Sequence, residues 1–411
     1  MKRIELTILL IIGFSMTLMA QNPFVTRGDM IEHFNISPNG KSIVYREITL
    51  DGFSQISMKD LETGKITLVS CVNLMSNNAM NDIFSGADFL ADNVIVFSKE
   101  GYMVSFDTVK KKRKQLFKLP DDIISSVKVT NDGKGIYWIG SNRVYYASIK
   151  KGITAQTDKM DETVISLAID KNDHAYYTTT AGKVYSFDGL SGVKDITSEL
   201  AEIAAEPFVV IEAAEDENCF IVRNGKEGVF NIDLTTGKSD KLMDYKKESP
   251  SYMMRLTPDG KTLYYNTLYE KRKIRKLNIS ANQASDTDIQ DDVVIDISSE
   301  RKFAPLPHTD DGIYYKVDEL AEFPGGQVAM RNFIDEHFKR PTNSQPDIIE
   351  AIVVVESDGI IRDTMITGGN HIGEDVKNEI LRVIGLMPKW KPAKVRGKAV
   401  PMFYSISFAV K

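Results

Sequence analysis

The chain has 411 residues, of which 42% are hydrophobic and 26% charged, and its net charge is -6 at neutral pH. This length exceeds that of an ordinary domain, so it predicts at least two units or one large repeat architecture. The acidic balance argues against the basic surface of general nucleic-acid binders, and we expect no nucleic-acid partner. Two cysteines, Cys71 and Cys219, are too few for a disulfide framework, although one bridge between them is compatible with an oxidising compartment.

The first 20 residues have the pattern of a secretory signal peptide. Two basic residues near the start precede an apolar stretch from Leu6 to Ala20, and Gln21 follows. This stretch is shorter than the ~20 residues that a membrane-spanning helix needs. We therefore expect export to the periplasm of a Gram-negative bacterium, with a mature chain that begins near Gln21. The alternative is an uncleaved anchor, in which residues 6–20 associate with the inner membrane.

Residues 21–315 have the pattern of short strands separated by turns. Six runs rich in β-branched and aromatic residues each follow a polar turn, and these turns recur every 40 to 53 residues. A second turn, Asp60–Lys65, reappears almost unchanged as Asp233–Lys238. A period of this length with about four strands per unit is typical of a β-propeller. The six polar turns are Pro38–Gly40, Ala91–Asn93, Asn131–Gly133, Lys171–Asp173, Asp216–Asn218 and Pro258–Gly260.

These units resemble the divergent repeats of bacterial periplasmic propellers of the TolB-like, WD-type kind. The resemblance implies a mainly β fold, a six- or seven-bladed propeller, with a partial seventh unit around Phe303 to Tyr315. A pair of β-sandwiches is the structural alternative, but it would not naturally produce two turn types at this period. The basic run Lys110–Lys114 falls at the second turn of its unit, so we expect a solvated loop there.

From residue 316 to residue 411 the pattern becomes that of a small α+β domain. The run Ile352–Val355 predicts a strand, which turns at Ser357–Gly359 into a second strand. In the last strand, Met402–Val410, apolar residues alternate with small or polar ones, so one face should pack on helices. Two amphipathic helices are expected from apolar stripes at Met330, Phe333, Ile334, His337 and Phe338, and at Val376, Ile380, Val383, Ile384 and Met387.

Three motifs in this region resemble the C-terminal domain of TonB-type energy transducers. They comprise Phe323, Pro324, Gly325 and Gly326, then Asp358 and Gly359, then Pro388, Trp390 and Pro392 with Gly397. The resemblance implies two helices on an antiparallel sheet, with an edge strand that pairs with the short TonB box of an outer-membrane transporter. It assigns partner binding to Met402, Phe403, Tyr404, Ser405, Ile406, Ser407 and Phe408.

The chain departs from this family pattern in two places. The stretch from Pro341 to Ile352 is a few residues short, and the repeats replace the Pro-rich spacer with which such transducers cross the periplasm. Two functions therefore stay open. One is a TonB-like coupler to an outer-membrane transporter or another envelope protein, with the propeller as a docking body. The other is a periplasmic ligand-binding or scaffold protein whose C-terminal domain is only a docking adaptor.

The sequence contains no motif that predicts catalysis. It has no GxSxG, P-loop or GxGxxG motif, and its five histidines lack the spacing of metal ligands. Glu374 and Asp375, near His371, are explained by the preference of acidic residues for a helix N-terminus. We therefore expect a non-enzymatic protein without catalytic residues, cofactor or metal.

Overall fold

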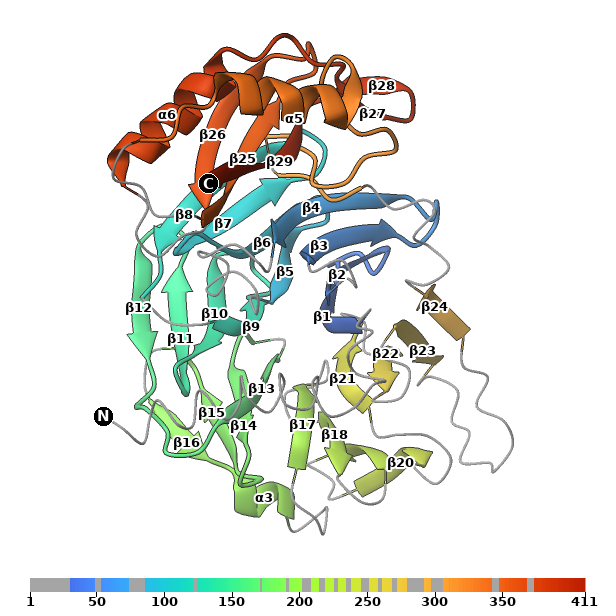
Figure 1. Ribbon diagram of the computed structural model, residues 1–411. Helices are drawn as coiled ribbons and strands as arrows, with labels where there is room; N and C mark the ends of the chain where they lie inside the picture. Colours follow the sequence, from blue (N-terminus) through green and yellow to red (C-terminus); the bar gives the residue numbers. More distant parts are fainter. Residues whose placement is uncertain are drawn as a thin grey trace. The chain divides into compact units, whose positions relative to one another are not determined.

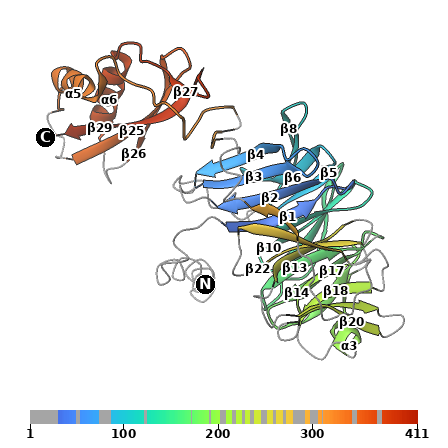
Figure 2. The same cartoon turned by 90° about the vertical axis from the view of Figure 1, so that its right-hand side faces the viewer.

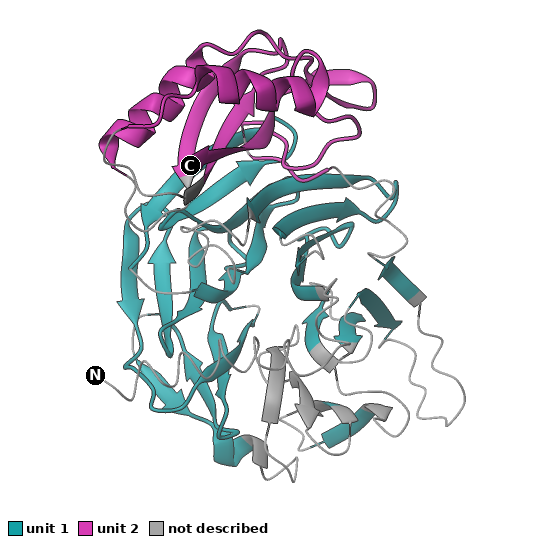
Figure 3. Ribbon diagram, viewed as in Figure 1, with its two compact units in different colours: residues 1–305 teal, residues 306–411 magenta. Residues whose placement is uncertain are grey.

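The computed structural model divides the chain into two compact units, residues 1–305 and residues 306–411 (Figure 3). The predicted signal peptide, residues 1–20, and the side chain of Cys219 lie outside the described part of the chain. Within that part, no helix has the length and hydrophobicity to cross a membrane. The described residues are 30–48, 53–73, 86–120, 124–170, 172–189, 192–201, 208–213, 219–224, 228–233, 238–244, 251–257, 261–267, 272–278, 292–296, 306–309, 311–341, 347–367 and 373–410.

The described residues of the first unit form six antiparallel sheets of four strands, and within each sheet the strands are neighbours in chain order (Figure 1). The prediction of a mainly β chain is confirmed. The first three sheets contain β1 (Met30–Ile36), β2 (Ser42–Ile48), β3 (Phe53–Asp60), β4 (Ile66–Asn73), β5 (Ala87–Ala91), β6 (Val94–Lys99), β7 (Tyr102–Asp107), β8 (Lys112–Lys118), β9 (Ile124–Val129), β10 (Gly135–Gly140), β11 (Arg143–Ser148) and β12 (Gly152–Gln156). The other three contain β13 (Val164–Ile169), β14 (Ala175–Thr179), β15 (Val184–Phe187), β16 (Val193–Asp195), β17 (Phe208–Ala213), β18 (Cys219–Asn224), β19 (Gly228–Asp233), β20 (Lys238–Asp244), β21 (Ser251–Leu256), β22 (Thr262–Thr267), β23 (Lys273–Asn278) and β24 (Asp292–Asp296), and the short helix α3 (Thr197–Ala201) follows β16.

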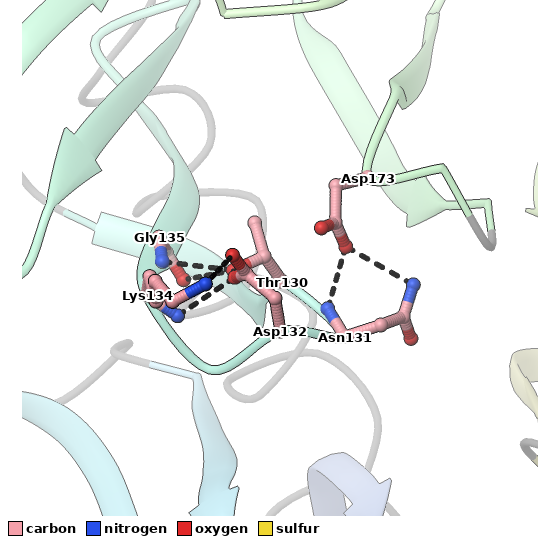
Figure 4. Close-up of polar contacts among 6 residues, drawn as sticks. All are labelled: Thr130, Asn131, Asp132, Lys134, Gly135 and Asp173. Carbon is pink, nitrogen blue, oxygen red and sulfur yellow. Dashed lines mark hydrogen bonds and ion pairs between the residues drawn. The ribbon is translucent and has the colours of Figure 1, made fainter.

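Side-chain hydrogen bonds hold the turns between the first two strands of a sheet. In the third sheet, Thr130 Oγ1 donates to Asp132 and accepts from the N–H of Gly135, while Asp132 accepts from the N–H of Lys134 (Figure 4). A short polar side chain that bonds the backbone two residues on is what makes such sequences form tight turns. Of the six polar turns expected from the sequence, Pro38–Gly40, Ala91–Asn93 and Asn131–Gly133 lie where the first two strands of their sheets meet, as predicted, whereas residues 171, 216–218 and 258–260 lie outside the described part of the chain.

Two of these turns are joined to the turn of the following sheet. Asn131 donates both its backbone N–H and its side-chain amide to Asp173 of the fourth sheet (Figure 4). The backbone N–H of Asn39 in the first sheet donates in the same way to Asp92 in the second. The asparagine and aspartate residues of the turns thus link consecutive sheets as well as shaping each hairpin.

Neighbouring sheets of the first unit also share their hydrophobic cores. Val44 of the first sheet lies in one cluster with Phe97 of the second, and Trp138 of the third sheet lies in one cluster with Met103 of the second. The first strands β1, β5, β9, β13, β17 and β21 contact one another in chain order, and β1 also contacts β21. The first and sixth sheets share a cluster that contains Ile31, Tyr45, Tyr264 and Ile295.

The basic run Lys110–Lys114, expected to be a solvated loop, is only partly a loop: residues 110 and 111 lie in the turn after β7, and residues 112–114 are the exposed first residues of the outer strand β8. Asp107, the last residue of β7, accepts hydrogen bonds from the N–H groups of Val109 and Lys110. Its carboxylate also forms an ion pair with Lys110 at 3.1 Å. The basic run therefore lies in the β7–β8 hairpin, and Asp107 at the start of the turn stabilises this hairpin.

The second unit contains a three-stranded antiparallel sheet in the order β26-β25-β29 and two longer helices (Figures 1 and 2). Ile334 of the first helix and Val376, Ile380, Val383 and Ile384 of the second share one core with the sheet, so both apolar stripes are confirmed. The elements are α5 (Gly326–His337), β25 (Asp347–Val355), β26 (Ile361–Thr367), α6 (Glu374–Gly385), β27 (Ala393–Val395), β28 (Lys398–Val400) and β29 (Met402–Val410).

Three details of this region differ from the sequence prediction. The central strand β25 begins at Asp347 instead of Ile352, because it pairs along all nine residues of β29. The units divide after Pro305, ten residues before the expected boundary at residue 315. Of the partial seventh repeat expected around Phe303 to Tyr315, the described residues 306–309 and 311–315 belong to the second unit, where Tyr314 forms a bridge to Met402. The segment Lys316–Ala321 belongs to the second unit, in which Glu319 is paired with Lys394.

Candidate partner-binding edge

The strand β29 is the outermost strand on one side of the three-stranded sheet, as the sequence predicted for an edge. It pairs with β25 without a register shift from Val355 opposite Met402 to Asp347 opposite Val410. Met402, Ile406 and Phe408 are buried against the helices, whereas Ser405 and Ser407 are exposed on the other face. The two-residue alternation of the sequence therefore separates a core face from a solvent face.

One hydrogen bond shows which backbone groups of β29 point away from β25. The N–H of Phe403 donates to Tyr314 at 3.0 Å, so it points away from β25. Because N–H and C=O groups alternate between the two sides of a strand, those of Ser405, Ser407 and Ala409 also point to the open side. In the described part of the chain, no backbone group pairs with these three residues from that side.

The residues assigned to partner binding from the sequence therefore fall into two groups. Met402, Tyr404, Ile406 and Phe408 direct their backbone groups to β25 and hold the sheet together. Phe403, Ser405 and Ser407 direct theirs outward, and Phe403 is already bonded to Tyr314. The open part of the edge thus begins after Phe403 and includes Ala409, which the sequence analysis had not assigned.

A carboxylate lies beside the open part of the edge. Glu350 of β25 is directly opposite Ser407 and diagonal to Ser405. Its two carboxylate oxygens accept hydrogen bonds from the hydroxyl groups of these serines, one each. The solvent face next to the open edge therefore carries the Glu350 carboxylate, hydrogen-bonded to both serines.

The three sequence motifs of the second unit meet at Trp390. The indole of Trp390 is 2% exposed, and its ring packs edge-on against Phe323 at 5.7 Å and Tyr404 at 4.9 Å between centroids. Its backbone N–H donates to the carbonyl of Gly359 at 2.8 Å. Lys391 exchanges two backbone hydrogen bonds with Glu322, the residue before the first motif. The motifs therefore form one structural cluster that supports β29 through Tyr404, and none of them lies on the open edge.

Glycine is required at two of these motif positions. Gly359 has φ +87°, and a Cβ atom there would lie 1.9 Å from the carbonyl oxygen of Trp390. Gly325 has φ +84°, and its Cβ would lie 2.8 Å from that of Ala329 in α5. Positive φ and these close approaches exclude a side chain at both places. Pro324, Pro388 and Pro392 flank the cluster outside helices and strands, Gly326 begins α5, Asp358 accepts from the N–H of Ile360, and Gly397 is in the β27–β28 turn.

The first unit contains a buried polar cluster that the sequence analysis missed. Asn35, Asp88, Lys128 and Arg255 lie on β1, β5, β9 and β21, the first strands of four sheets, and all four are buried. Each stands five residues before the last residue of its polar turn, which is the sequence signal that would have identified the set. On the second strand of each sheet, their pairing partners are Val44, Val96, Tyr137 and Tyr264. The equivalent position on the first strand is occupied by Ala168 in the fourth sheet and by Glu212 in the fifth.

Asn35 is the centre of this polar cluster. Its amide nitrogen donates to the carbonyl of Ala87 on β5 at 2.7 Å, and its amide oxygen accepts from Nε of Arg255 on β21 at 2.5 Å. Arg255 also contacts Nε2 of His33 at 3.3 Å. Asp88 accepts from the N–H of Val129 on β9 at 2.8 Å. The polar cluster therefore connects the first, second, third and sixth sheets through hydrogen bonds.

Burial shifts the pKa of Asp88 in the polar cluster and the pKa of His33 beside it in opposite directions. Burial of the Asp88 carboxyl raises its pKa to about 6, against a lowering effect of Lys128. Burial, with the charges of Arg255, Lys128 and Arg46, lowers the pKa of His33 well below its usual value. The charged forms of both side chains are thus less stable in this buried environment than they are in water.

We expect the Asp88→Asn substitution to change how stability depends on pH. Since the folded pKa is raised, the folded protein binds more protons than the unfolded chain between about pH 4 and pH 6. This group therefore lowers the free energy of unfolding as pH rises through that window, by about 3 kcal/mol in total. In urea unfolding experiments from pH 4 to pH 7, the free energy of unfolding of the variant should increase relative to that of the wild type as the pH rises. Parallel curves for the two proteins would contradict the assigned shift.

Within the described residues, no group of three or more histidine, cysteine, aspartate or glutamate side chains is placed to hold a metal ion. His337 packs against Phe333 and bonds its carbonyl at 2.8 Å, which is the behaviour of a structural histidine. Cys71 is buried and not in a disulfide. No protein-family model and no curated protein matches this chain.

Proposed function

We propose that the second unit is a TonB C-terminal-like domain that binds an extended segment of a cell-envelope protein as an additional strand beside β29. The observation that carries this proposal is the row of outward N–H and C=O groups on Ser405, Ser407 and Ala409. An open edge of this kind gives affinity through backbone hydrogen bonds with modest demands on the partner's sequence. The partner that fits the resemblance best is the TonB box of an outer-membrane transporter.

We further propose that the first unit closes into a six-bladed propeller that serves as a protein-interaction body. The contact of β1 with β21 and the core shared by the first and sixth sheets support closure. Hydrogen bonds from Arg255 to Asn35 and from Asn266 to the carbonyl of Ile31 join the same two sheets. Ring packing of this type buries both faces of every sheet, which four isolated strands cannot do.

The place of action that we propose is the periplasmic side of the cell envelope, on the basis of residues 1–20. The coupling role needs a tether to the inner membrane, whereas a scaffold role does not. The repeats stand where transducers of this family have their Pro-rich spacer, which favours docking over force transmission. Both roles use the same edge of β29, and neither involves catalysis.

The test compares two proline variants of adjacent residues. Ser405→Pro removes an outward N–H, so the domain should stay folded while binding weakens at least tenfold. Ile406→Pro removes an N–H directed to Ala351 in β25, so the second unit should lose about 3 kcal/mol of stability or more. Circular dichroism measures folding, and calorimetry measures binding of TonB-box peptides from transporters of the source bacterium.

The control for this pair is Ser407→Ala, which keeps every backbone donor and should bind within about threefold of the wild type. The proposal is wrong if the wild-type chain binds none of the peptides, or if both proline variants fold and bind normally.

A further inference from the structure

The residues just before the second unit's motifs form a small hairpin beside the start of β29. Thr309 donates its N–H to Ile313 at 2.9 Å, and its hydroxyl oxygen accepts from the N–H of Ile313 at 3.0 Å. This is the pattern of the turns in the first unit, with a hydroxyl residue first and a glycine, Gly312 at φ +85°, near the end. The N–H of Tyr315 donates to the carbonyl of Pro307 at 2.9 Å and closes the hairpin.

This hairpin, whose described residues are 307–309 and 311–315 and which we call the hairpin Pro307–Tyr315, bonds to outward groups of Pro401, just before β29, and of Phe403 at its beginning. Tyr314 donates to the carbonyl of Pro401 at 2.9 Å and accepts from the N–H of Phe403 at 3.0 Å, in a parallel bridge. After Tyr315 the chain leaves β29, because Asp318 and Glu319 bond to Lys394 of β27. Among its described residues, the hairpin therefore bonds to the backbone of Pro401 and Phe403 and not to that of Ser405, Ser407 or Ala409.

Side-chain packing fixes the hairpin in this place. Ile313 is 6% exposed, and Tyr314 packs against the hydrophobic core of the second unit. The ring of Tyr315 stacks on that of Phe403 at 4.9 Å, and the ring of His308 lies 5.0 Å from that of Tyr314. An incoming peptide that displaced the hairpin would regain the two hydrogen bonds but lose this packing, so displacement is unfavourable.

We propose that the hairpin Pro307–Tyr315 is a built-in stop that limits a partner strand to the part of the edge from Ser405 to Ala409. The proposal rests on the proposed function and defines its footprint: an extended segment of about five residues that ends beside the hairpin. The partner residues next to Ser405 and Ser407 lie on the face that carries the Glu350 carboxylate.

The experiment measures amide hydrogen exchange by NMR in the full chain, without and with peptides. In the free protein, the amides of Phe403 and Tyr314 should exchange slowly and those of Ser405, Ser407 and Ala409 quickly. Fast exchange at Phe403 in the free protein would overturn the stop without any peptide being needed. The probes are a five-residue TonB-box peptide and a nine-residue form of the same segment.

In the wild type, both peptides should protect Ser405, Ser407 and Ala409, leave Tyr314 protected, and bind within about threefold of each other. Binding of the longer peptide with loss of protection at Tyr314 would overturn the stop while leaving the proposed function intact. Failure of both peptides to protect the three outward amides would instead count against the proposed function.

Two variants separate the stop from the fold. Tyr314→Pro removes the donor to Pro401, and the longer peptide should then gain about tenfold in affinity over the shorter one. Tyr315→Ala keeps the backbone but removes the ring stacked on Phe403, so the Phe403 amide should exchange faster in a folded domain. If Tyr315→Ala leaves the exchange of Phe403 unchanged and Tyr314→Pro gives no length dependence, the hairpin is not a stop.

Discussion

Replacing Gly359 by alanine is expected to destabilise the second unit by about 4 kcal/mol or more. The added Cβ would lie 1.9 Å from the carbonyl oxygen of Trp390, and the residue has φ +87°. The oxygen is a backbone atom and the Cβ is fixed directly to the backbone, so no side-chain rotation can relieve the clash. The β25–β26 hairpin would have to move away from the segment that carries Trp390. That movement breaks the hydrogen bond from Trp390 to Gly359 and opens the core around the indole.

A matched control for this substitution is Gly397→Ala. Gly397 has φ +75° in the β27–β28 turn, and beyond its chain neighbours no atom lies within 4 Å of the position that a Cβ would take. The control therefore carries the backbone strain without the clash and should cost only about 1 kcal/mol. Hydrogen exchange detected by mass spectrometry over β25, β26 and β29 measures both. Equal protection in the two variants would contradict the assigned contact.

Replacing Asn35 by alanine is expected to destabilise the first unit by about 3–5 kcal/mol. The amide of Asn35 is 1% exposed and joins β1 to Ala87 on β5 and to Arg255 on β21. Its removal takes a hydrogen bond from a buried guanidinium and from a buried carbonyl, and it leaves a cavity in a region without access to water. Because these bonds connect the first sheet to the second and the sixth, exchange should increase in β1, β5 and β21 together.

The control for Asn35 is Asn39→Ala in the exposed turn of the same sheet. Asn39 accepts hydrogen bonds from Ser37 and from the N–H of Lys41, so its loss weakens one turn only, by about 1 kcal/mol. Urea unfolding followed by hydrogen exchange compares the two variants. If Asn35→Ala costs no more than Asn39→Ala, the polar cluster does not hold the sheets together.

Local features of this protein were determined by the sequence itself. In the described part of the chain, the polar turns of the first three sheets lie where the sequence predicted them, because their short polar side chains bond the adjacent backbone. The helical stripes of α5 and α6 and the alternation along β29 predicted which side chains are buried. These features depend on residues a few positions apart, so a single sequence contains all the information they need.

Other features were decided by contacts between distant residues. A turn with the same pair of bonds as that of Thr130, one residue shorter, recurs at Thr309, yet Tyr314, which follows this turn, bonds to Pro401 and Phe403 instead of beginning another sheet. The spacing of the polar cluster before its turns is visible in the sequence, but only the packing of the sheets brings Asn35 into contact with Ala87 and Arg255. Which outward groups of β29 are open depends on Tyr314, about 90 residues earlier in the chain. Backbone groups are the same in every residue, so only the tertiary structure decides which of them are already paired.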